Sequence, residues 1–302
     1  MPSDNVGAAV APSQFQTFLK RLLSTVVLWA VVLGALFSGY KPLAGGAVVL
    51  VLNLICFFGL MEFCDLMEAA GRRTYRKQTV GLGNVALLAC SYAWWQAEGM
   101  GGNARLLMSL FPGLVLVATL VHGVLCQDTK TSPLAVICSA FGFLYVSWTL
   151  CLILAFYFAP GANGSWWLLY FILITKASDM GAYLVGSLIG RHKLIPRLSP
   201  GKTWEGFAGA IVVSTTVSLV FAHFAQDRLE GITFAHALVL GLFLSAGAVA
   251  GDLVESLFKR EASVKDSGRY FPGIGGVLDL VDSLLFNAPI MYAYLVWMSL
   301  DR

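Results

Sequence analysis

The chain has 302 residues, of which 58% are hydrophobic and only 12% are charged, and its formal net charge is +3. Soluble domains carry about 25% charged residues, so this composition, with its repeated long apolar runs, indicates a polytopic helical membrane protein. Lipid cannot satisfy open backbone groups, so the spans should be helices. The small net charge gives no indication of a nucleic-acid partner, and the six cysteines include no C-x-x-C pair that would suggest zinc.

Hydropathy divides the chain into a short polar tail and a series of apolar spans. Residues 1–15 are small and polar, and we expect a disordered tail there. Nine spans follow, at about 20–39, 43–66, 79–97, 105–126, 133–158, 165–189, 204–225, 233–258 and 275–299. We therefore predict an all-α membrane bundle of about nine transmembrane helices.

Embedded charges distinguish the two halves of this predicted bundle. Acidic side chains inside or beside the spans concentrate after residue 161. Because such residues are costly in lipid and mark functional sites, we expect residues 16–160 to form a scaffold and residues 161–302 to carry the chemistry. We find no internal repeat in the sequence, which weakens the case for an inverted-repeat transporter.

The basic residues predict the orientation. Alternate loops hold 15 Lys and Arg residues, the other loops hold 4, and Lys176 lies inside a span. The positive-inside rule therefore places the N-terminus and the basic loops in the cytoplasm. We expect a protein of a bacterial-type inner membrane whose active site faces the cytoplasm.

The most highly charged stretch runs from Asp252 to Ser283. Its acids recur at helical spacing on two predicted helices, with Asp252, Glu255 and Lys259 on one face and Asp279 and Asp282 on another. A basic connector and the glycine-rich sequence PGIGG lie between the two helices. Carboxylates hold Mg²⁺, cations neutralise phosphate, and glycines let an anion approach closely. The pattern therefore predicts a metal–phosphate site, with ordinary interfacial ion pairs as the alternative.

A second polar cluster, RHKLIPRLSPGKTWEG, covers residues 191–206. Ser199-Pro200-Gly201 predicts a turn, and Lys202-Thr203 should open a helix with Glu205 in its first turn. Such a helix start suits a phosphate, although a capped helix beside a basic loop is the alternative. The upstream glycines do not fit a Walker A motif.

Two further groups of charges leave alternatives open. Asp179 lies three residues after Lys176, so these two could form a structural ion pair or take part in a site. Glu62, Asp65 and Glu68 are expected to form a salt-bridged helix end whose side chains reach toward water, or else to line a substrate entrance. We assign no role to the four scattered histidines.

These motifs together resemble a known family. The runs SLFKR at 256–260, KDSG at 265–268, PGIGG at 272–276 and DLVDS at 279–283 resemble the signature of the phosphatidate cytidylyltransferases, also called CDP-diacylglycerol synthases. SPGKTWEG at 199–206 and DMGAY at 179–183 resemble further elements of that family. The resemblance covers about residues 165–290.

The resemblance implies a helical, Mg²⁺-dependent membrane enzyme that joins phosphatidate to the CMP part of CTP and releases pyrophosphate. It implies that Asp252, Asp279 and Asp282 hold one or two Mg²⁺ ions, with a second, monovalent ion left open, and that Lys259 joins them in catalysis. The implied substrate contacts form a larger set: Asp179, Ser199, Pro200, Lys202, Thr203, Glu205, Arg260, Lys265, Asp266 and Gly268.

Two positions depart from the family pattern. Ile274 stands where the family usually has His, and Leu280 stands where it usually has Arg. We expect nearby cations such as Arg269 to compensate, since the metal-type acids are intact.

The alternative functions are an ion- or proton-coupled transporter that uses Asp179, Lys176 and Asp252, and a catalytically impaired homologue that acts as a scaffold. Spans rich in Gly and Ala are compatible with a homodimer.

Overall fold

The computed structural model describes residues 30, 33–34, 36–95, 101–125, 133–159, 163–264, 267–268 and 275–300. The predicted N-terminal tail and most of the first predicted span lie outside these residues. Lys265, Asp266, Arg269 and Ile274 lie outside them as well.

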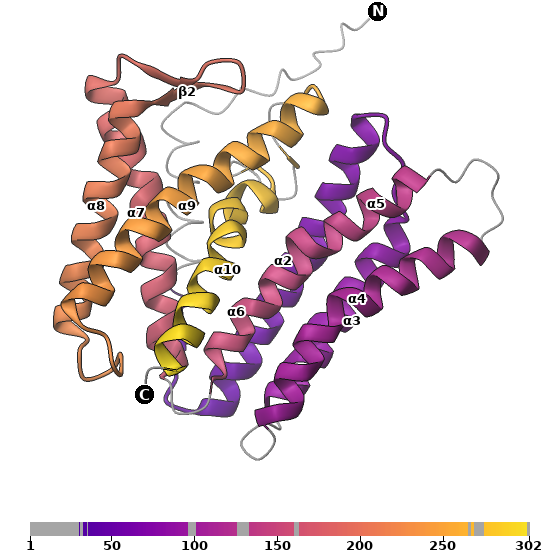
Figure 1. Cartoon of the computed structure of the whole chain (residues 1–302), viewed down its shortest axis with the longest axis horizontal. Coiled ribbons are helices and arrows are strands. Elements are labelled where there is room, and N and C mark those ends of the chain that lie inside the picture. Colours follow the sequence, from indigo (N-terminus) through magenta and orange to yellow (C-terminus); the bar gives the residue numbers. More distant parts are fainter. Residues whose placement is uncertain are drawn as a thin grey trace, which may run out of the picture.

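The first half of the described chain is a set of long helices (Figure 1). They are α2 (Lys41–Ala69), α3 (Arg76–Trp95), α4 (Gly101–Leu125) and a continuous span of α5 (Pro133–Gly142), the π-helical segment η2 (Phe143–Trp148) and α6 (Thr149–Tyr157). Helix α2 has a proline in its first turn and is followed by Gly71, whose φ of +73° suits the left-handed end of a helix.

The second half contains four long helices and a small hairpin. They are α7 (Gly164–Ile189), β1 (Lys193–Ile195), β2 (Ser199–Thr203), α8 (Trp204–Phe224), α9 (Phe234–Glu261) and α10 (Val277–Leu300). Thr203 caps α8 by accepting a hydrogen bond from the backbone N–H of Gly206, and Thr233 caps α9 in the same way with His236. Helix α7 packs on α8, α8 on α9, and α9 on α10.

The all-helical membrane fold is confirmed. Within the described residues, six helical stretches are long and apolar enough to cross a membrane: Lys41–Ala69, Pro133–Tyr157, Gly164–Ile189, Trp204–Phe224, Phe234–Glu261 and Val277–Met298. Helices α3 and α4 lie where the third and fourth spans are predicted, but neither is among these six stretches. The part of α4 that covers Pro112–Leu125 is apolar but shorter than a membrane span. The protein is therefore an integral membrane protein, and the count of nine spans and the N-terminal orientation stay predictions.

The turn predicted at Ser199-Pro200-Gly201 is wrong. These residues lie in strand β2, and the turn falls at residues 196–198. The two strands pair antiparallel with an irregular register, because Lys193 pairs with Thr203 whereas Ile195 pairs with Ser199. The extra residues of β2 bulge between these pairs, and a bulge at an edge is where a sheet tolerates proline and glycine.

Helices α7 and α8 approach each other closely through glycines. A methyl group at Gly181 would lie 2.7 Å from the carbonyl oxygen of Gly209 and 2.8 Å from Cβ of Val213. Small residues allow such backbone contact, which is a main source of helix association in membranes. Farther from the hairpin on the same two helices, the hydroxyls of Tyr170 and Ser218 form a buried hydrogen bond of 2.7 Å. This packing fixes the hairpin at the end of the α7–α8 pair.

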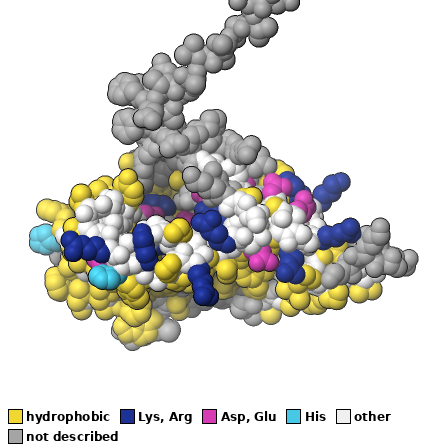
Figure 2. Space-filling model, turned by 90° about the horizontal axis from the view of Figure 1, so that it is seen from above, with side chains coloured by type: hydrophobic (Ala, Val, Ile, Leu, Met, Phe, Trp, Pro, Cys, Tyr) yellow, Lys and Arg dark blue, Asp and Glu magenta, His cyan; other side chains and the backbone are white. Residues whose placement is uncertain are grey.

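Figure 2 looks onto the end of the bundle that carries the hairpin. Lys and Arg side chains gather on this end, whereas hydrophobic side chains cover the flanks. Arg72 pairs with Glu261 at 3.4 Å, and Nε of Arg260 donates to the carbonyl oxygen of Leu198 at 3.1 Å. Three of the basic loops thus meet at one end of the molecule.

Replacing Gly209 by leucine should separate α7 from α8, because the added side chain would overlap Val185 and the carbonyl oxygen of Gly181. Overpacking of this kind costs about 1–3 kcal/mol, so we expect a clearly lower thermal unfolding midpoint in detergent. Gly81→Leu is the matched control, since a Cβ there meets nothing within 4 Å. Equal midpoints for the two variants would contradict the close contact.

Candidate active site

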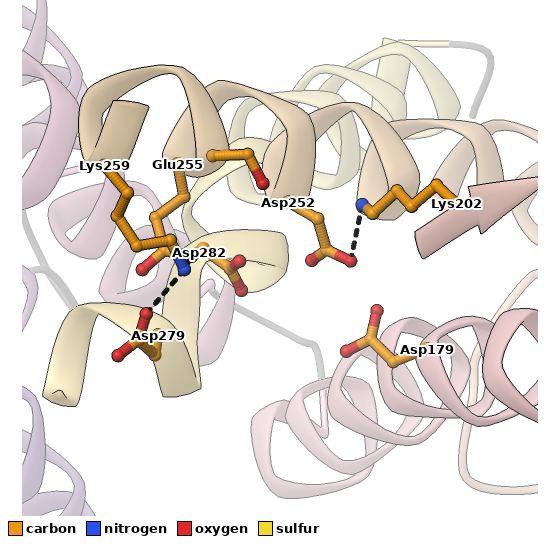
Figure 3. Close-up of a pocket in the computed structure, with 8 residues that line it drawn as sticks. Asp179, Lys202, Asp252, Glu255, Lys259, Asp279 and Asp282 are labelled. Atoms are coloured by element: carbon orange, nitrogen blue, oxygen red, sulfur yellow. Dashed lines mark hydrogen bonds and ion pairs between the residues drawn. The ribbon is translucent and has the colours of Figure 1, made fainter. Parts of the chain in front are cut away.

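One pocket opens near the basic end of the bundle (Figure 3). It has a volume of about 330 Å³, at the lower end of the range of small-molecule sites. It is lined by residues of α7, β2, α9 and α10: Asp179, Lys202, Asp252, Glu255, Ser256, Lys259, Asp279 and Asp282. All four residues predicted to be catalytic are among them.

The close approach of α9 to α10 brings these acids together. A methyl group at Gly251 would lie 2.8 Å from the carbonyl oxygen of Asp282 and 3.0 Å from Cα of Ser283. The helical spacing of Asp252, Glu255 and Lys259 then turns all three toward the first turns of α10. The predicted juxtaposition of carboxylates from two separate helices is therefore confirmed.

Two lysines enter the pocket from opposite sides (Figure 3). Nζ of Lys259 donates to Oε2 of Glu255 at 2.7 Å and to Oδ1 of Asp279 at 2.8 Å. Nζ of Lys202 donates to Oδ2 of Asp252 at 2.8 Å. Among the described residues, the lining contains five carboxylates and two ammonium groups, so negative charge is in excess.

The structural ion pair between Lys176 and Asp179, one of the two predicted alternatives, is present. Nζ of Lys176 lies 3.0 Å from Oδ2 of Asp179, and it also donates to Oγ of Ser283 at 3.0 Å. Ser283 in turn donates to the same carboxylate oxygen at 3.1 Å, which ties α7 to α10. Oδ1 of Asp179 is buried and has no hydrogen-bond partner among the described residues.

The donor set suits a hard cation. Asp252 and Asp282 approach each other side chain to side chain, as do Glu255 and Asp279, and Oε1 of Glu255 is buried without a partner among the described residues. Buried like charges are stabilised by a compensating cation or by a proton that one carboxylate of a pair takes up. Carboxylate oxygens are the ligands that Mg²⁺ takes, together with waters and substrate phosphates. The residues therefore fit the predicted ion by their chemistry.

The carboxylates are not pre-arranged as a closed cage. Within the described part of the chain, no three Asp, Glu, His or Cys side chains form a metal-binding group. Oδ1 of Asp279 contacts Lys259, and its Oδ2 accepts from the backbone N–H groups of Ser267 and Gly276. Oδ1 of Asp282 accepts from the backbone N–H of Ser283 at 2.6 Å. The metal role of Asp252, Asp279 and Asp282 stays a prediction.

Of the SPGKTWEG motif, Lys202 is the residue that lines the pocket. Thr203 is the buried cap of α8, and Ser199 and Pro200 lie in strand β2. Glu205 accepts from the backbone N–H groups of Arg191 and His192 at 3.1 and 3.2 Å, so it fixes the start of the hairpin to α8. Substrate contacts of these residues stay predictions.

Two other predicted substrate contacts lie outside the pocket lining. The guanidinium of Arg260 holds the hairpin through Leu198, and Gly268 lies against the side chain of Glu62. Lys265 and Asp266 are outside the described residues.

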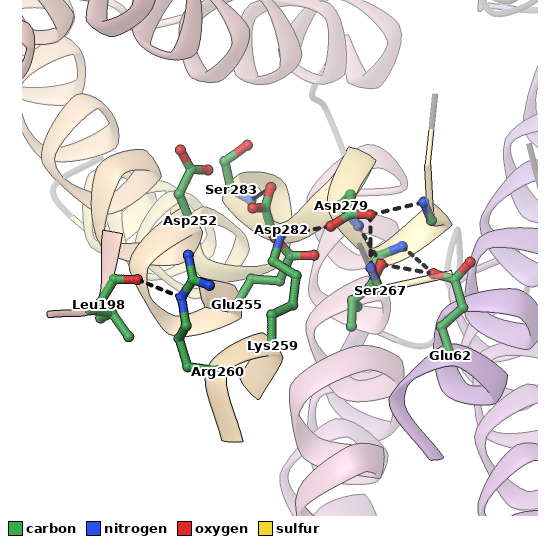
Figure 4. Close-up of polar contacts among 12 residues, drawn as sticks. Glu62, Leu198, Asp252, Glu255, Lys259, Arg260, Ser267, Asp279, Asp282 and Ser283 are labelled. Carbon is green, nitrogen blue, oxygen red and sulfur yellow. Dashed lines mark hydrogen bonds and ion pairs between the residues drawn. The ribbon is translucent and has the colours of Figure 1, made fainter. Parts of the chain in front are cut away.

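The expected solvated role of Glu62 is wrong. Asp65 and Glu68 do pair with Arg76 at the end of α2, but Glu62 is fully buried and reaches α10 (Figure 4). It accepts from the N–H groups of Val277 at 2.9 Å and Leu278 at 2.8 Å. Sequence reasoning missed this because the three acids share helical spacing. The sequence does distinguish Glu62 in one respect: it lies about one helical turn farther inside the apolar run than Asp65, which indicates burial.

Three further residues lie at the site but are absent from the predicted metal and substrate contacts: Glu255, Ser256 and Tyr145. Glu255 and Ser256 line the pocket. Tyr145, from the first half of the chain, has a buried hydroxyl without a partner among the described residues, within electrostatic range of Asp282, Glu255 and Asp252. Glu255 could have been found from its shared helix face, whereas no local pattern points to Tyr145.

Comparison with known proteins supports the resemblance seen in the motifs. The chain matches the profile of the cytidylyltransferase family over residues 19–298. It is 33% identical over 287 residues to a phosphatidate cytidylyltransferase of Haemophilus influenzae, covering 89% of this chain and 96% of the relative. A Bacillus subtilis protein of the same name is 36% identical over 217 residues, which cover 70% of this chain and 75% of the relative.

A third relative, the phosphatidate cytidylyltransferase of Staphylococcus haemolyticus, is 41% identical over 143 residues, which are 47% of this chain and 54% of the relative. The family resemblance predicted from the motifs is thus confirmed. Since the profile covers nearly the whole chain and the Haemophilus relative aligns along almost its full length, the chain belongs to the cytidylyltransferase family.

Proposed function

We propose that the protein transfers the CMP part of CTP to phosphatidate, forming CDP-diacylglycerol and pyrophosphate in phospholipid biosynthesis. The observation that carries this proposal is the meeting of carboxylates from α9 and α10 with two lysines in one pocket of a membrane bundle. The family membership supports cytidylyl transfer, and the names of the relatives support phosphatidate as the acceptor.

The reaction is an in-line substitution at the α-phosphorus of CTP. A phosphate oxygen of phosphatidate forms the new bond, the bond to the bridging oxygen of the β-phosphate breaks, and pyrophosphate leaves with that electron pair. The attacking oxygen is already anionic at neutral pH, so the site needs no strong general base. Catalysis then depends on positioning and charge neutralisation.

The acidic residues of the pocket and its two lysines have different roles in this reaction. Asp252, Asp279 and Asp282 would hold one or two Mg²⁺ ions, which neutralise charge on the phosphates when bound. Lys202 and Lys259, on opposite sides of the pocket, bind phosphate oxygens and orient the triphosphate. Leu280 packs against the apolar core and brings no charge to the site, so Lys202 and Lys259 are the cations that the described part of the pocket supplies.

The membrane setting suits a lipid acceptor. Basic loops and the pocket share one end of the bundle, where a phosphatidate headgroup would lie while its acyl chains stay in the bilayer. The excess of cations in these loops supports a cytoplasmic position, where CTP is present. We therefore place the active site at the cytoplasmic face of the inner membrane.

The direct test incubates the purified protein with radiolabelled CTP, phosphatidate and Mg²⁺, with EDTA as the control. We expect labelled CDP-diacylglycerol and pyrophosphate that EDTA abolishes. Absence of both products would support the scaffold alternative, and CTP-independent ion uptake into vesicles would support the transporter.

Replacing Asp282 by asparagine keeps the shape of a nearly buried side chain but removes its charge. If Asp282 holds a Mg²⁺ ion that neutralises the phosphates, we expect kcat to fall by about 100-fold or more, with little change in the thermal midpoint. Steady-state kinetics checks this. Asp227→Asn, an exposed acid in the α8–α9 connection, should behave like wild type. Wild-type turnover of Asp282→Asn would remove the proposed role.

Replacing Lys202 by methionine removes an ammonium group from the pocket and leaves Asp252 without its partner at 2.8 Å. We expect kcat/KM for CTP to fall by about 10- to 100-fold, because a charge-assisted hydrogen bond to phosphate contributes about 1.5–3 kcal/mol. Lys193→Met on the same hairpin is the control, since Lys193 is exposed and is not in the pocket lining. Equal kcat/KM values for the two variants would exclude a phosphate contact by Lys202.

A further inference from the structure

We propose that Glu62 of α2 is a positioning residue for the reaction, acting through Ser267 on Asp279. This inference rests on the proposed function, but its structural basis is independent of the substrate. It connects the first half of the chain, whose described residues do not line the pocket, with the turn that begins α10.

The carboxylate of Glu62 caps the N-terminus of α10. Its Oε1 accepts from the N–H of Val277 and its Oε2 from the N–H of Leu278. The first N–H groups of a helix have no partner within the helix, and the positive end of the helix dipole favours a negative group there. A side chain distant in sequence thereby fixes the first turn of α10, which carries Asp279 and leads to Asp282.

Ser267 links Glu62 to Asp279 (Figure 4). Oγ of Ser267 donates to Oε2 of Glu62 at 3.4 Å and accepts from the backbone N–H of Asp279 at 3.3 Å. The backbone N–H of Ser267 donates to Oδ2 of Asp279 at 3.1 Å. The other oxygen of Asp279 contacts Lys259, so a continuous path of hydrogen bonds joins α2 to the pocket.

Two glycines of the signature are explained by this path. A Cβ at Gly268 would overlap Oε1 and Cδ of Glu62 and lie 2.8 Å from its Cγ. A Cβ at Gly276 would overlap Oγ of Ser267 and lie 2.7 Å from Oε2 of Glu62. These glycines leave room for the buried carboxylate, which is a different reason for their presence than close approach of a phosphate.

The free-energy cost of burying the carboxylate of Glu62 indicates that this side chain has a role beyond packing. A carboxylate inside a protein is costly unless it is fully hydrogen-bonded, and here it lies near a pocket that already holds five acids. A neutral cap would satisfy the same helix end at lower cost. The negative charge of Glu62 instead orients the hydroxyl of Ser267 toward α2, so that its lone pair accepts from the N–H of Asp279.

The first experiment compares Glu62→Gln with Glu68→Gln, a change on the same helix at an exposed acid that pairs only loosely with Arg76, at 3.9 Å. We expect Glu62→Gln to lower kcat by about 10- to 100-fold with less than about threefold change in the KM for CTP, because a misplacement near 1 Å has such an effect on rate. Amide hydrogen exchange of residues 277–283 should become faster, without substrate present. Glu68→Gln should match wild type in both measurements.

The second experiment tests the link that Ser267 forms between Glu62 and Asp279. Ser267→Ala leaves both backbone bonds of Glu62 in place, so the bundle should keep its thermal midpoint while kcat falls. Gly268→Ala should lower kcat by about 10-fold in the wild-type background but by less than about twofold in a Glu62→Ala background, because the overlap is then relieved.

The outcomes separate this inference from the proposed function. An active wild type with Glu62→Gln or Ser267→Ala at wild-type kcat overturns the positioning role, as do equal costs of Gly268→Ala in both backgrounds. If the wild type makes no CDP-diacylglycerol, the proposed function fails, and unchanged hydrogen exchange at residues 277–283 in Glu62→Gln then overturns the positioning role as well.

Discussion

The contact between α9 and α10 at Gly251 is the constraint on which the site depends. Only a glycine permits the backbone of α10 to come so near, and this nearness forces carboxylates of both helices into one small pocket. Carboxylates so placed repel each other unless cations or bound protons offset their charge. Lys202 and Lys259 supply part of that charge, and a phosphate-bound metal would supply the rest.

The first half of the chain does more than enclose the site. Phe63 of α2, Tyr145 of η2 and Phe258 of α9 form an aromatic cluster with centroid distances of 5.6–6.4 Å. Phe258 lies three residues after Glu255 on α9, so this cluster packs beside the helix face that lines the pocket. The π-helical segment that carries Tyr145 also hydrogen-bonds α2 through Ser147 and Cys56, at 3.3 Å. Such segments are frequent at functional sites.

The hairpin has a role that its motif does not reveal. In the resemblance to the family, most of SPGKTWEG is implied to contact substrate. Here Thr203 and Glu205 hold the hairpin onto α8, and Arg260 holds its turn. Lys202 of strand β2 reaches Asp252. One residue of the motif reaches the pocket, and its neighbours fix the position from which it does so.

The sequence alone determined the class of protein and most of the chemistry. Apolar runs of helical length require helices in lipid, and the spacing of Asp252, Glu255 and Lys259 requires one shared face, because both follow from local geometry. The family followed from motifs of fixed spacing. The tertiary structure alone decided which helices approach each other, and with that the pairing of Lys202 with Asp252 and the bonds of Glu62 to the start of α10. These contacts join residues that are 50 and 215 or more positions apart, and no local pattern records such a distance.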